Sequence, residues 1–388
     1  MSHVVVAADK FKGSLTAAEV AAHVAAGLRR ARPGLRVLEV PMADGGEGTV
    51  DAALAAGGRE RRVAVTGPLG EPVTARYALL DDADHGPTAV LEMALASGLA
   101  LTPADDGAAR DSSSIGTGQL VADALDAGAR RVVLGVGGSA STDGGAGMLA
   151  ALGVRLLDDA GAPLPGGGDA LRRLARVDLS GLDPRLADTE LVLAADVENP
   201  LLGPDGAAAV YGPQKGADEA AVADLEAGLA RWVEALVEAG AATAREIAAA
   251  RGAGAAGGVG FGALLLGATR RRGVDVVLDL TGFDDAVAGA ALVVTGEGSL
   301  DEQSLFGKTP VGVAAAAARA GVPTVAVAGR SPLPAEELAR HGIAGRYVLS
   351  DIEPDVAVSI AEAGRLLETL AEAIAEDHLQ PDRQDALR

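Results

Sequence analysis

Cysteine is absent from the 388-residue sequence, which excludes disulfides, thiolate nucleophiles and thiolate-bound zinc. Histidine is also scarce, and His23, His85 and His341 all lie outside the glycine-rich segments of the chain. A Ser-His-Asp triad or a histidine-ligated metal is therefore not indicated. The remaining side chains with catalytic chemistry are carboxylates and lysines.

Positive charge is in short supply, because the formal net charge is −21. Such a chain is poorly suited to nucleic acid or to anionic membrane surfaces. The apolar N-terminal run soon meets Asp9 and Lys10, unlike a signal peptide, and Arg319 and Pro323 interrupt the Ala-rich stretch 311–328. We expect a cytoplasmic protein with a small-molecule substrate, and the sequence leaves its oligomeric state open, a homo-oligomer included.

Lysine is the rarer of the two strong cations. The sequence has 33 Lys and Arg residues, of which four are lysine, so 33 − 4 = 29 are arginine. The four lysines all fall in glycine-containing segments: Lys10, Lys12, Lys215 and Lys308. A compact ammonium group suits a phosphate contact, although four residues could also be placed there by chance.

Short apolar segments alternate with amphipathic ones at both ends of the chain. The pattern predicts parallel strands at residues 3–8, 36–41, 290–295, 322–328 and 346–349, with helices between them. Thr16 and Glu19 have the spacing of a capping box that begins the first helix. We expect a discontinuous Rossmann-like α/β domain formed by residues 1–66 and 286–388.

The middle of the chain has a different pattern. Residues 62–80 and 89–93 alternate like antiparallel strands around a turn at 67–70, and residues 217–251 form a long Ala-rich helical stretch. Residues 67–285 are therefore predicted to form an inserted mixed α/β domain.

Four predicted strand-to-helix loops share glycines, carboxylates and hydroxyl residues. They lie at residues 9–15, 43–49, 137–145 and 295–301, the last continuing to 307–309. Ligands of parallel sheets bind at such loops, where glycine lets the backbone approach a phosphate and carboxylates suit Mg²⁺. Each loop alone is also ordinary turn chemistry, so the prediction depends on the set of four.

Two standard nucleotide motifs are matched only in part. The sequence Gly307-Lys308-Thr309 ends like a Walker A loop, but Glu302 occupies the position that requires glycine. Residues 135–140 fit G-x-G-x-x-G/A after a good strand at 131–136, and Asp158 follows near the distance expected of a ribose partner. A nicotinamide-dependent oxidoreductase therefore stays open as an alternative.

The loops together resemble the bacterial glycerate kinase family. The ordered motifs are DKFKGSL at 9–15, ADGGEGT at 43–49, GGSASTDGG at 137–145, DVENPL at 196–201, YGPQKGA at 211–217, GAGAAGGVGFG at 252–262 and TGEGSLDEQSLFGKTP at 295–310. Lys10, Tyr211 and Ser299 depart from the usual family residues, and Ser299 stands where a basic residue is common.

The resemblance implies phosphoryl transfer from ATP, with Mg²⁺, to a hydroxyl of D-glycerate, in a cleft between two domains. The product expected is 2-phosphoglycerate, with 3-phosphoglycerate as the alternative. A non-catalytic sensor of phosphorylated metabolites is a further alternative. Because aromatic residues make up 2% of the chain, we expect apolar contacts and backbone, rather than stacking, to hold adenine.

Phosphoryl transfer needs positioning, charge neutralisation and a proton acceptor, and the loops supply candidates for each. The predicted catalytic residues are Lys12, Asp44, Asp143, Asp196 and Lys308. The predicted nucleotide-binding residues are Ser14, Gly137, Gly138, Ser139, Gly296 and Gly298, and those for substrate are Lys10, Arg110 and Lys215. Glu47, Glu297 and Asp301 are the predicted magnesium ligands. Helix capping, turn formation and surface ion pairing are the structural alternatives.

Overall fold

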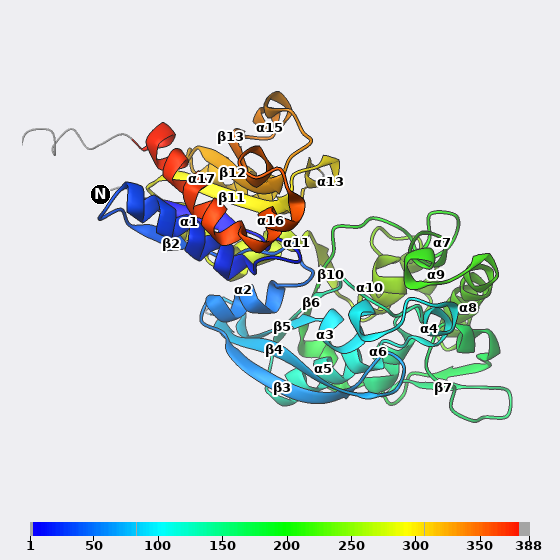
Figure 1. The fold of residues 1–388 in the computed structure, drawn as a ribbon. Helices are drawn as coiled ribbons and strands as arrows, with labels where there is room; N and C mark the ends of the chain where they lie inside the picture. The colour runs from blue at the N-terminus through cyan, green and yellow to red at the C-terminus, as the bar shows by residue number, and fades with distance from the viewer. Residues whose placement is uncertain (1–2, 83, 306, 380–388) are drawn as a thin grey trace, which may run out of the picture. The chain divides into compact units, whose positions relative to one another are not determined.

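The computed structural model describes residues 3–82, 84–305 and 307–379, and the chain divides into two compact units (Figure 1). Unit 1 comprises Met1–Asp44, Asp51–Gly57 and Gly273–Arg388, and unit 2 comprises Gly45–Val50 and Gly58–Arg272. The predicted class, a parallel-sheet α/β domain with an inserted mixed domain, is confirmed. The unit bounds differ from the predicted ones over residues 45–50, over residues 58–66, whose strand pairs within unit 2, and over residues 273–285.

Unit 1 is built on a five-stranded parallel sheet with the order β13-β12-β11-β1-β2. Its strands are β1 (His3–Ala8), β2 (Val37–Glu39), β11 (Ala290–Ser299), β12 (Thr324–Arg330) and β13 (Ile343–Val348). Val4, Val5 and Val6 are all fully buried, as expected for a strand that is covered on both faces. All five strands lie where the sequence predicted strands, within a few residues at each end.

Helices cover both faces of the unit 1 sheet. On one face α1 (Ala17–Ala31) and α17 (Ala363–His378) lie side by side, as Figure 1 shows. They pack against alternate strand residues. On the other face lie α11 (Gly273–Leu280), α12 (Phe283–Val287) and α14 (Thr309–Arg319). The β1–β2 connection through α1 and the β11–β12 connection through α14 are therefore on opposite faces. Adjacent β1 and β11 form the switch point at which ligands bind in such sheets.

The helices of unit 1 begin where their sequences indicate. Thr16 caps α1 by accepting a hydrogen bond from the backbone N–H of Glu19, and the Glu19 carboxylate accepts one from the backbone N–H of Thr16, which confirms the predicted capping box. Pro310 lies in the first turn of α14, where its missing N–H costs nothing.

Unit 2 has a six-stranded mixed sheet with the order β10-β9-β6-β5-β4-β3. Its strands are β3 (Arg59–Thr66), β4 (Pro72–Asp82), β5 (Gly86–Glu92), β6 (Arg131–Gly135), β9 (Glu190–Ala194) and β10 (Thr269–Arg271). The pairs β3–β4 and β4–β5 are antiparallel, so the predicted antiparallel region is confirmed, and the remaining pairs are parallel.

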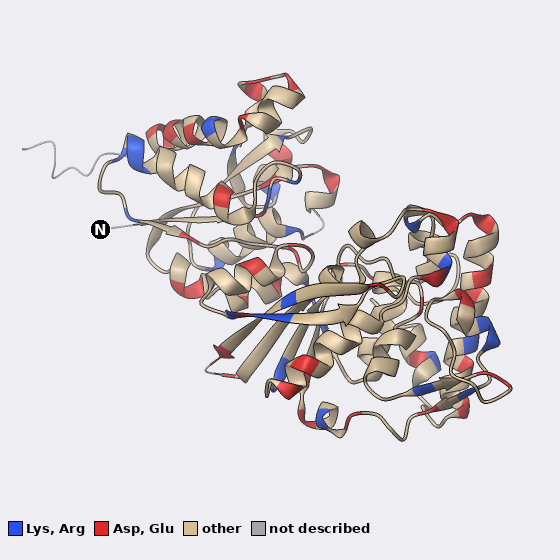
Figure 2. Cartoon of the chain, turned by 60° about the horizontal axis from the view of Figure 1, so that its bottom comes forward, with Lys and Arg blue, Asp and Glu red and all other residues tan. Residues whose placement is uncertain are grey.

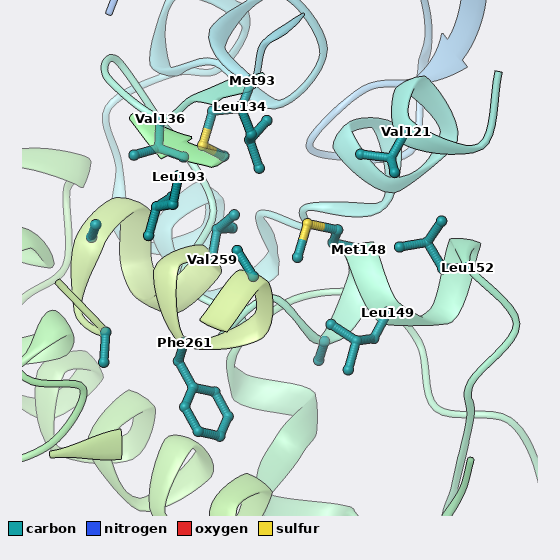
Figure 3. Close-up of a cluster of buried hydrophobic side chains, with 14 of the residues drawn as sticks. Met93, Val121, Leu134, Val136, Met148, Leu149, Leu152, Leu193, Val259 and Phe261 are labelled. Atoms are coloured by element: carbon teal, nitrogen blue, oxygen red, sulfur yellow. The ribbon is translucent and has the colours of Figure 1, made fainter. Parts of the chain in front are cut away.

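The core of unit 2 lies between this sheet and the helices around it. Met93, Leu134 and Leu193 pack near α10 (Ala255–Leu265), and Met148 and Leu149 extend from α6 (Ala146–Ala151), as Figure 3 shows.

The Ala-rich stretch 217–251, predicted to be helical, contains two helices. It forms α8 (Glu219–Glu238) and α9 (Ala244–Ala248), separated at Gly240, whose φ of 99° ends the first helix. Trp232 of α8 is fully buried.

Most of the remaining α-helices and strands are short. They are α2 (Thr49–Ala55), α3 (Ala94–Ser97), α4 (Asp106–Asp111), α5 (Ile115–Asp126), α7 (Ala207–Tyr211), α13 (Glu302–Leu305), α15 (Ala335–Arg340), α16 (Val356–Ala361), β7 (Arg155–Leu157) and β8 (Arg176–Asp178). None of the described helices combines the length and apolar character that a bilayer crossing needs. Acidic residues lie on outer helices of both units (Figure 2), in keeping with the net charge of −21.

Candidate active site

A cavity of about 430 Å³ opens at the carboxyl ends of the unit 1 strands. Asp9 follows β1, Glu297 lies near the end of β11, Arg330 ends β12 and Leu349 follows β13. The cavity thus includes the β1–β11 switch point, and its volume falls within the range of small-molecule sites.

Asp9 is the most enclosed carboxylate of this cavity, with 6% of its surface exposed. Its Oδ1 accepts a hydrogen bond of 2.7 Å from the backbone N–H of Lys10, and its Oδ2 accepts one of 3.0 Å from the Thr309 hydroxyl. The pKa of Asp9 is raised to about 6, chiefly by burial; the charge of Lys10 lowers it and the charge of Asp44 raises it. Sequence reasoning missed Asp9 as a site residue, although its position directly after an apolar strand was visible.

Glu297 is the second carboxylate, and one of its oxygens lacks a partner. Its Oε1 is buried without a hydrogen bond from any described residue. Burial raises the pKa of Glu297 to about 7; Ser304 and Lys308 lower it, and Asp9 and Asp301 raise it. A buried carboxylate oxygen without a donor, next to a second carboxylate, suits a hard cation such as Mg²⁺.

The described residues contain no cluster of three carboxylate or imidazole side chains placed to ligate one metal ion. This arrangement still fits Mg²⁺, which usually takes one or two protein carboxylates and fills its octahedron with water and substrate phosphates. Asp9 and Glu297 are the residues that could supply those carboxylates.

Four cations line the same cavity: Lys10, which pairs with Asp9 at 3.5 Å, and three others. Lys12 is exposed; Lys308 precedes α14, with its Nζ donating to Oε1 of Gln303 at 3.3 Å; and Nε of Arg330 donates to the Ser299 hydroxyl at 3.2 Å. Sequence reasoning missed Arg330, which is the last residue of the apolar strand β12. Arg330 brings positive charge to the loop in which Ser299 stands in place of the family's basic residue.

The structure brings one group of predicted residues together in this cavity. They are Lys10, Lys12, Ser14, Glu297, Gly298, Asp301 and Lys308. Gly296 is not among them. β11 continues through Ser299, so the predicted loop 295–301 is wrong over residues 295–299. A Cβ at Gly296 would lie 2.3 Å from the carbonyl oxygen of Val327 on β12. Gly296 therefore permits close strand packing.

The carboxylate of Asp143 in unit 2 is buried and hydrogen-bonded to neighbouring residues. Asp143 is 1% exposed, and its carboxylate accepts hydrogen bonds from the hydroxyls of Ser113 and Ser114 and from the backbone N–H groups of Ser114, Gly145 and Gly147. Burial raises the pKa of Asp143, and the donors from Ser114, Gly147 and Gly145 lower it. The geometry favours a structural role for this carboxylate over that of a base.

Lys215 is buried as well, with 2% of its surface exposed. Its Nζ donates to the carbonyl oxygen of Ser141 at 2.7 Å and to the hydroxyl of Ser139 at 3.2 Å. Burial lowers the pKa of Lys215 to about 7, and the charge of Asp143 opposes this shift. Lys215 holds the loop after β6 in place, and this environment does not favour the predicted contact with substrate.

Gly137 and Gly138 are exposed in the same loop, and a Cβ at Gly137 would lie 2.7 Å from Cα of Gly46. The loop 137–145 thus packs against the start of the 45–50 segment. Glu92, missed by sequence reasoning, anchors that segment by accepting hydrogen bonds from the backbone N–H groups of Gly48 at 3.1 Å and Val50 at 2.6 Å. A phosphate-binding role for this loop stays a prediction.

Arg110 does not have the free guanidinium that a substrate clamp requires. It pairs with Asp224 at 2.7 Å, Asp106 at 2.8 Å and Asp169 at 3.1 Å. Asp196 and Glu47 are both exposed, and Asp44 is half-buried close enough to Asp9 to affect its pKa.

The dinucleotide fingerprint lacks its required structural context. After β6 the chain runs through residues 136–145 before α6 begins at Ala146, so no helix starts at the glycines. Asp158 lies in a turn after β7, where its carboxylate accepts from the backbone N–H groups of Ala160 and Ala162. The nicotinamide alternative therefore has no support in this geometry.

Comparisons with known proteins agree with the motifs. The sequence profile described as the glycerate kinase family matches residues 4–379. A glycerate kinase of Halalkalibacterium halodurans is 45% identical over 377 residues, covering 97% of this chain and 98% of that protein. A glycerate 2-kinase of Escherichia coli is 43% identical over 342 residues, covering 88% of each chain. A crystal structure named as a glycerate kinase 2, from Salmonella typhimurium LT2, superposes with a TM-score of 0.81 at 39% identity and covers 98% of this chain and 100% of its own. This chain belongs to the glycerate kinase family.

Proposed function

We propose that the protein transfers the γ-phosphoryl group of ATP, with Mg²⁺, to a hydroxyl of D-glycerate. The observation that carries the proposal is the pairing of Asp9 and Glu297 with Lys12 and Lys308 in one cavity at the sheet's switch point. Phosphoryl transfer requires carboxylates that bind a cation and, next to them, ammonium groups that bind phosphate oxygens. The names of the relatives supply the acceptor, glycerate.

Each charged group of the cavity has a distinct role in this proposal. Asp9 and Glu297 would hold Mg²⁺, which neutralises phosphate charge when bound. Lys12 and Lys308 bind the oxygens of the transferring phosphoryl group, and Lys308 does so at the N-terminus of α14, where backbone N–H groups also favour anions. We assign proton acceptance to Asp44, since its charge acts on Asp9 and it is half-buried beside the carboxylate pair.

The product that we propose is 2-phosphoglycerate. The E. coli relative, with 43% identity over 342 residues, is named as a glycerate 2-kinase, and the Salmonella structure is named as a glycerate kinase 2. The alternative, 3-phosphoglycerate, differs only in which hydroxyl faces the phosphoryl group.

Phosphorus NMR of the reaction with D-glycerate and magnesium-ATP tests the activity and the product together. We expect a new phosphomonoester signal split into a doublet by the single proton on carbon 2. A triplet would instead assign the phosphate to the methylene carbon 3. If folded enzyme leaves ATP unconsumed and no new signal forms, the glycerate assignment is wrong, and the sensor alternative would then be tested by ligand-induced thermal stabilisation.

A further inference from the structure

The unit 1 cavity has two chemically different ends. One end carries Asp9, Lys12, Glu297 and Lys308, all near the carboxyl ends of β1 and β11. The other end is formed after β13 by Leu349, Pro354, Val356, Ile360 and Ala363, with apolar side chains from the β13–α16 connection, α16 and α17. Ser350, Glu353 and Ser359 also line this end. The lysines that suit phosphate oxygens lie at the charged end, whereas the lining residues between 349 and 363 include no lysine or arginine and are mainly apolar.

Two residues at the apolar end lie in an unusual environment for aliphatic side chains. Val356 is 71% exposed and Ile360 is 48% exposed, although both line a cavity. α16 is held to the charged end by a hydrogen bond of 3.0 Å from the Ser14 hydroxyl to the carbonyl oxygen of Ile360. Exposed apolar side chains that rim a concave site mark a surface that a ligand covers.

The distance between the two ends also defines the ligand. In the strand order β13-β12-β11-β1, three intervals separate β1 from β13. At about 4.8 Å for each interval, the end of β13, which Leu349 follows, lies roughly 14 Å across the sheet from the end of β1, which Asp9 follows. That span is comparable with an extended nucleoside triphosphate and too long for glycerate, whose every carbon also carries an oxygen.

We propose that the apolar end of this cavity binds the nucleoside of the phosphoryl donor, with Val356 and Ile360 against the base and ribose. The triphosphate then runs along the strand ends toward Lys12 and Lys308. The lysines at one end complement the charge of a triphosphate, and the apolar surface at the other end complements a nucleoside. A nucleoside triphosphate is therefore the one occupant that we assign to this cavity. The inference rests on the proposed kinase function and assigns the residues that hold the nucleoside.

A double variant, Val356→Asn/Ile360→Asn, tests the assignment without adding charge near the triphosphate. Val358→Asn is the matched control, because Val358 lies on the same helix and is 38% exposed but does not line the cavity. Isothermal titration calorimetry with magnesium-ATP and with magnesium-tripolyphosphate, both without glycerate, separates the nucleoside contact from the phosphate contact.

We expect the double variant to raise the Kd for magnesium-ATP and the KM for ATP by about tenfold or more, as expected when two aliphatic contacts are lost. Its Kd for magnesium-tripolyphosphate and its KM for D-glycerate should stay within about twofold of the wild type. The Val358→Asn control should match the wild type in all four constants.

An unchanged Kd for magnesium-ATP in a folded double variant would overturn the inference. So would a rise in the KM for glycerate alone, or a change in oligomeric state, seen by light scattering, without a change in ATP affinity. If the wild type binds magnesium-ATP but does not phosphorylate glycerate, the proposed function fails, while the calorimetric comparison still decides the nucleoside site.

Discussion

The burial of Asp9 and Glu297 would cost free energy without any benefit if the protein had no ligand. Each carboxylate is largely shielded from water, and burial is the largest cause of both raised pKa values. The Oε1 atom of Glu297 also lacks a hydrogen bond within the described residues. Groups with strongly shifted pKa values cluster at functional sites, where a ligand supplies the charge or hydrogen bond that the protein itself does not provide.

The Glu297→Gln variant is expected to lose activity and, at high pH, to gain stability. The folded pKa of about 7 lies above the ordinary value of 4.5, so the folded protein binds this proton more tightly than the unfolded chain. The contribution of Glu297 to the free energy of unfolding is therefore most favourable below pH 4.5 and is lost as the pH rises through about 7. Without metal, the variant should gain about 1–3 kcal/mol at pH ~8, with little gain at pH ~5, and lose about 100-fold in kcat/KM.

Urea unfolding in a chelating buffer at the two pH values checks the stability, and a coupled ATPase assay checks the activity. Glu302→Gln serves as the control, because Glu302 is exposed and does not line the cavity. A Glu297→Gln variant that is less stable than the wild type at both pH values would contradict the burial argument.

At the scale of elements, the loop after β6 depends on a strained neighbour. Ala256, Gly257 and Gly258 in α10 have positive φ values of 56°, 65° and 92°. This kink brings Gly257 against the loop, where a Cβ would lie 1.9 Å from the carbonyl oxygen of Ser141 and 3.0 Å from Nζ of Lys215. Backbone conformation and close packing both require glycine here.

Gly257→Ala should therefore destabilise the protein more than an ordinary left-handed glycine replacement. Gly203→Ala is the matched control: its φ is +93°, but nothing lies within 4 Å of the position that a Cβ would occupy. We expect a loss of about 1–2 kcal/mol for Gly203→Ala from backbone strain alone. For Gly257→Ala we expect a further ~2 kcal/mol or more, because a backbone oxygen cannot move aside easily.

Thermal unfolding monitored by circular dichroism measures both variants. Equal losses for Gly257→Ala and Gly203→Ala would show that the loop 137–145 relaxes freely and would contradict its tight packing against α10.

At the scale of the whole molecule, each unit has a core of its own. In unit 2 the core residues come from the six-stranded sheet and the helices around it, and they include the only tryptophan, Trp232, which is fully buried. Its Nε1 donates a hydrogen bond of 3.1 Å to the carbonyl oxygen of Gly144. A unit with its own core can in principle fold alone.

The fragment 58–272 should fold cooperatively when expressed by itself. Its fluorescence should show the blue-shifted emission of a buried indole and move to longer wavelength in a single denaturant transition. Emission typical of a water-exposed tryptophan in native buffer would contradict an independent core. The fragment lacks Gly45–Val50, so we expect a lower midpoint than for a version that carries this segment, which Glu92 holds.

Much of the fold follows from local sequence patterns. The strand His3–Ala8, the Thr16–Glu19 capping box and the antiparallel pairing of β3 with β4 were all predictable, because each depends on residues that are close in the chain. The helical stretch predicted at 217–251 is present, but Gly240, with its left-handed backbone, divides it into two helices. The predicted meeting of both substrates between the two domains stays a prediction.

The sequence by itself determined the α/β class, the two-part organisation and the family, since these depend on periodicity and on motifs in order along the chain. Only the tertiary structure decided which motif residues share a site. It placed Asp9, Arg330 and Glu297 around one cavity and enclosed Asp143 and Lys215 in a hydrogen-bonded core. The physical reason is that burial and partners set the chemistry of a carboxylate or an ammonium group, and here several of these partners, such as Thr309 for Asp9 and Ser114 for Asp143, are distant in sequence.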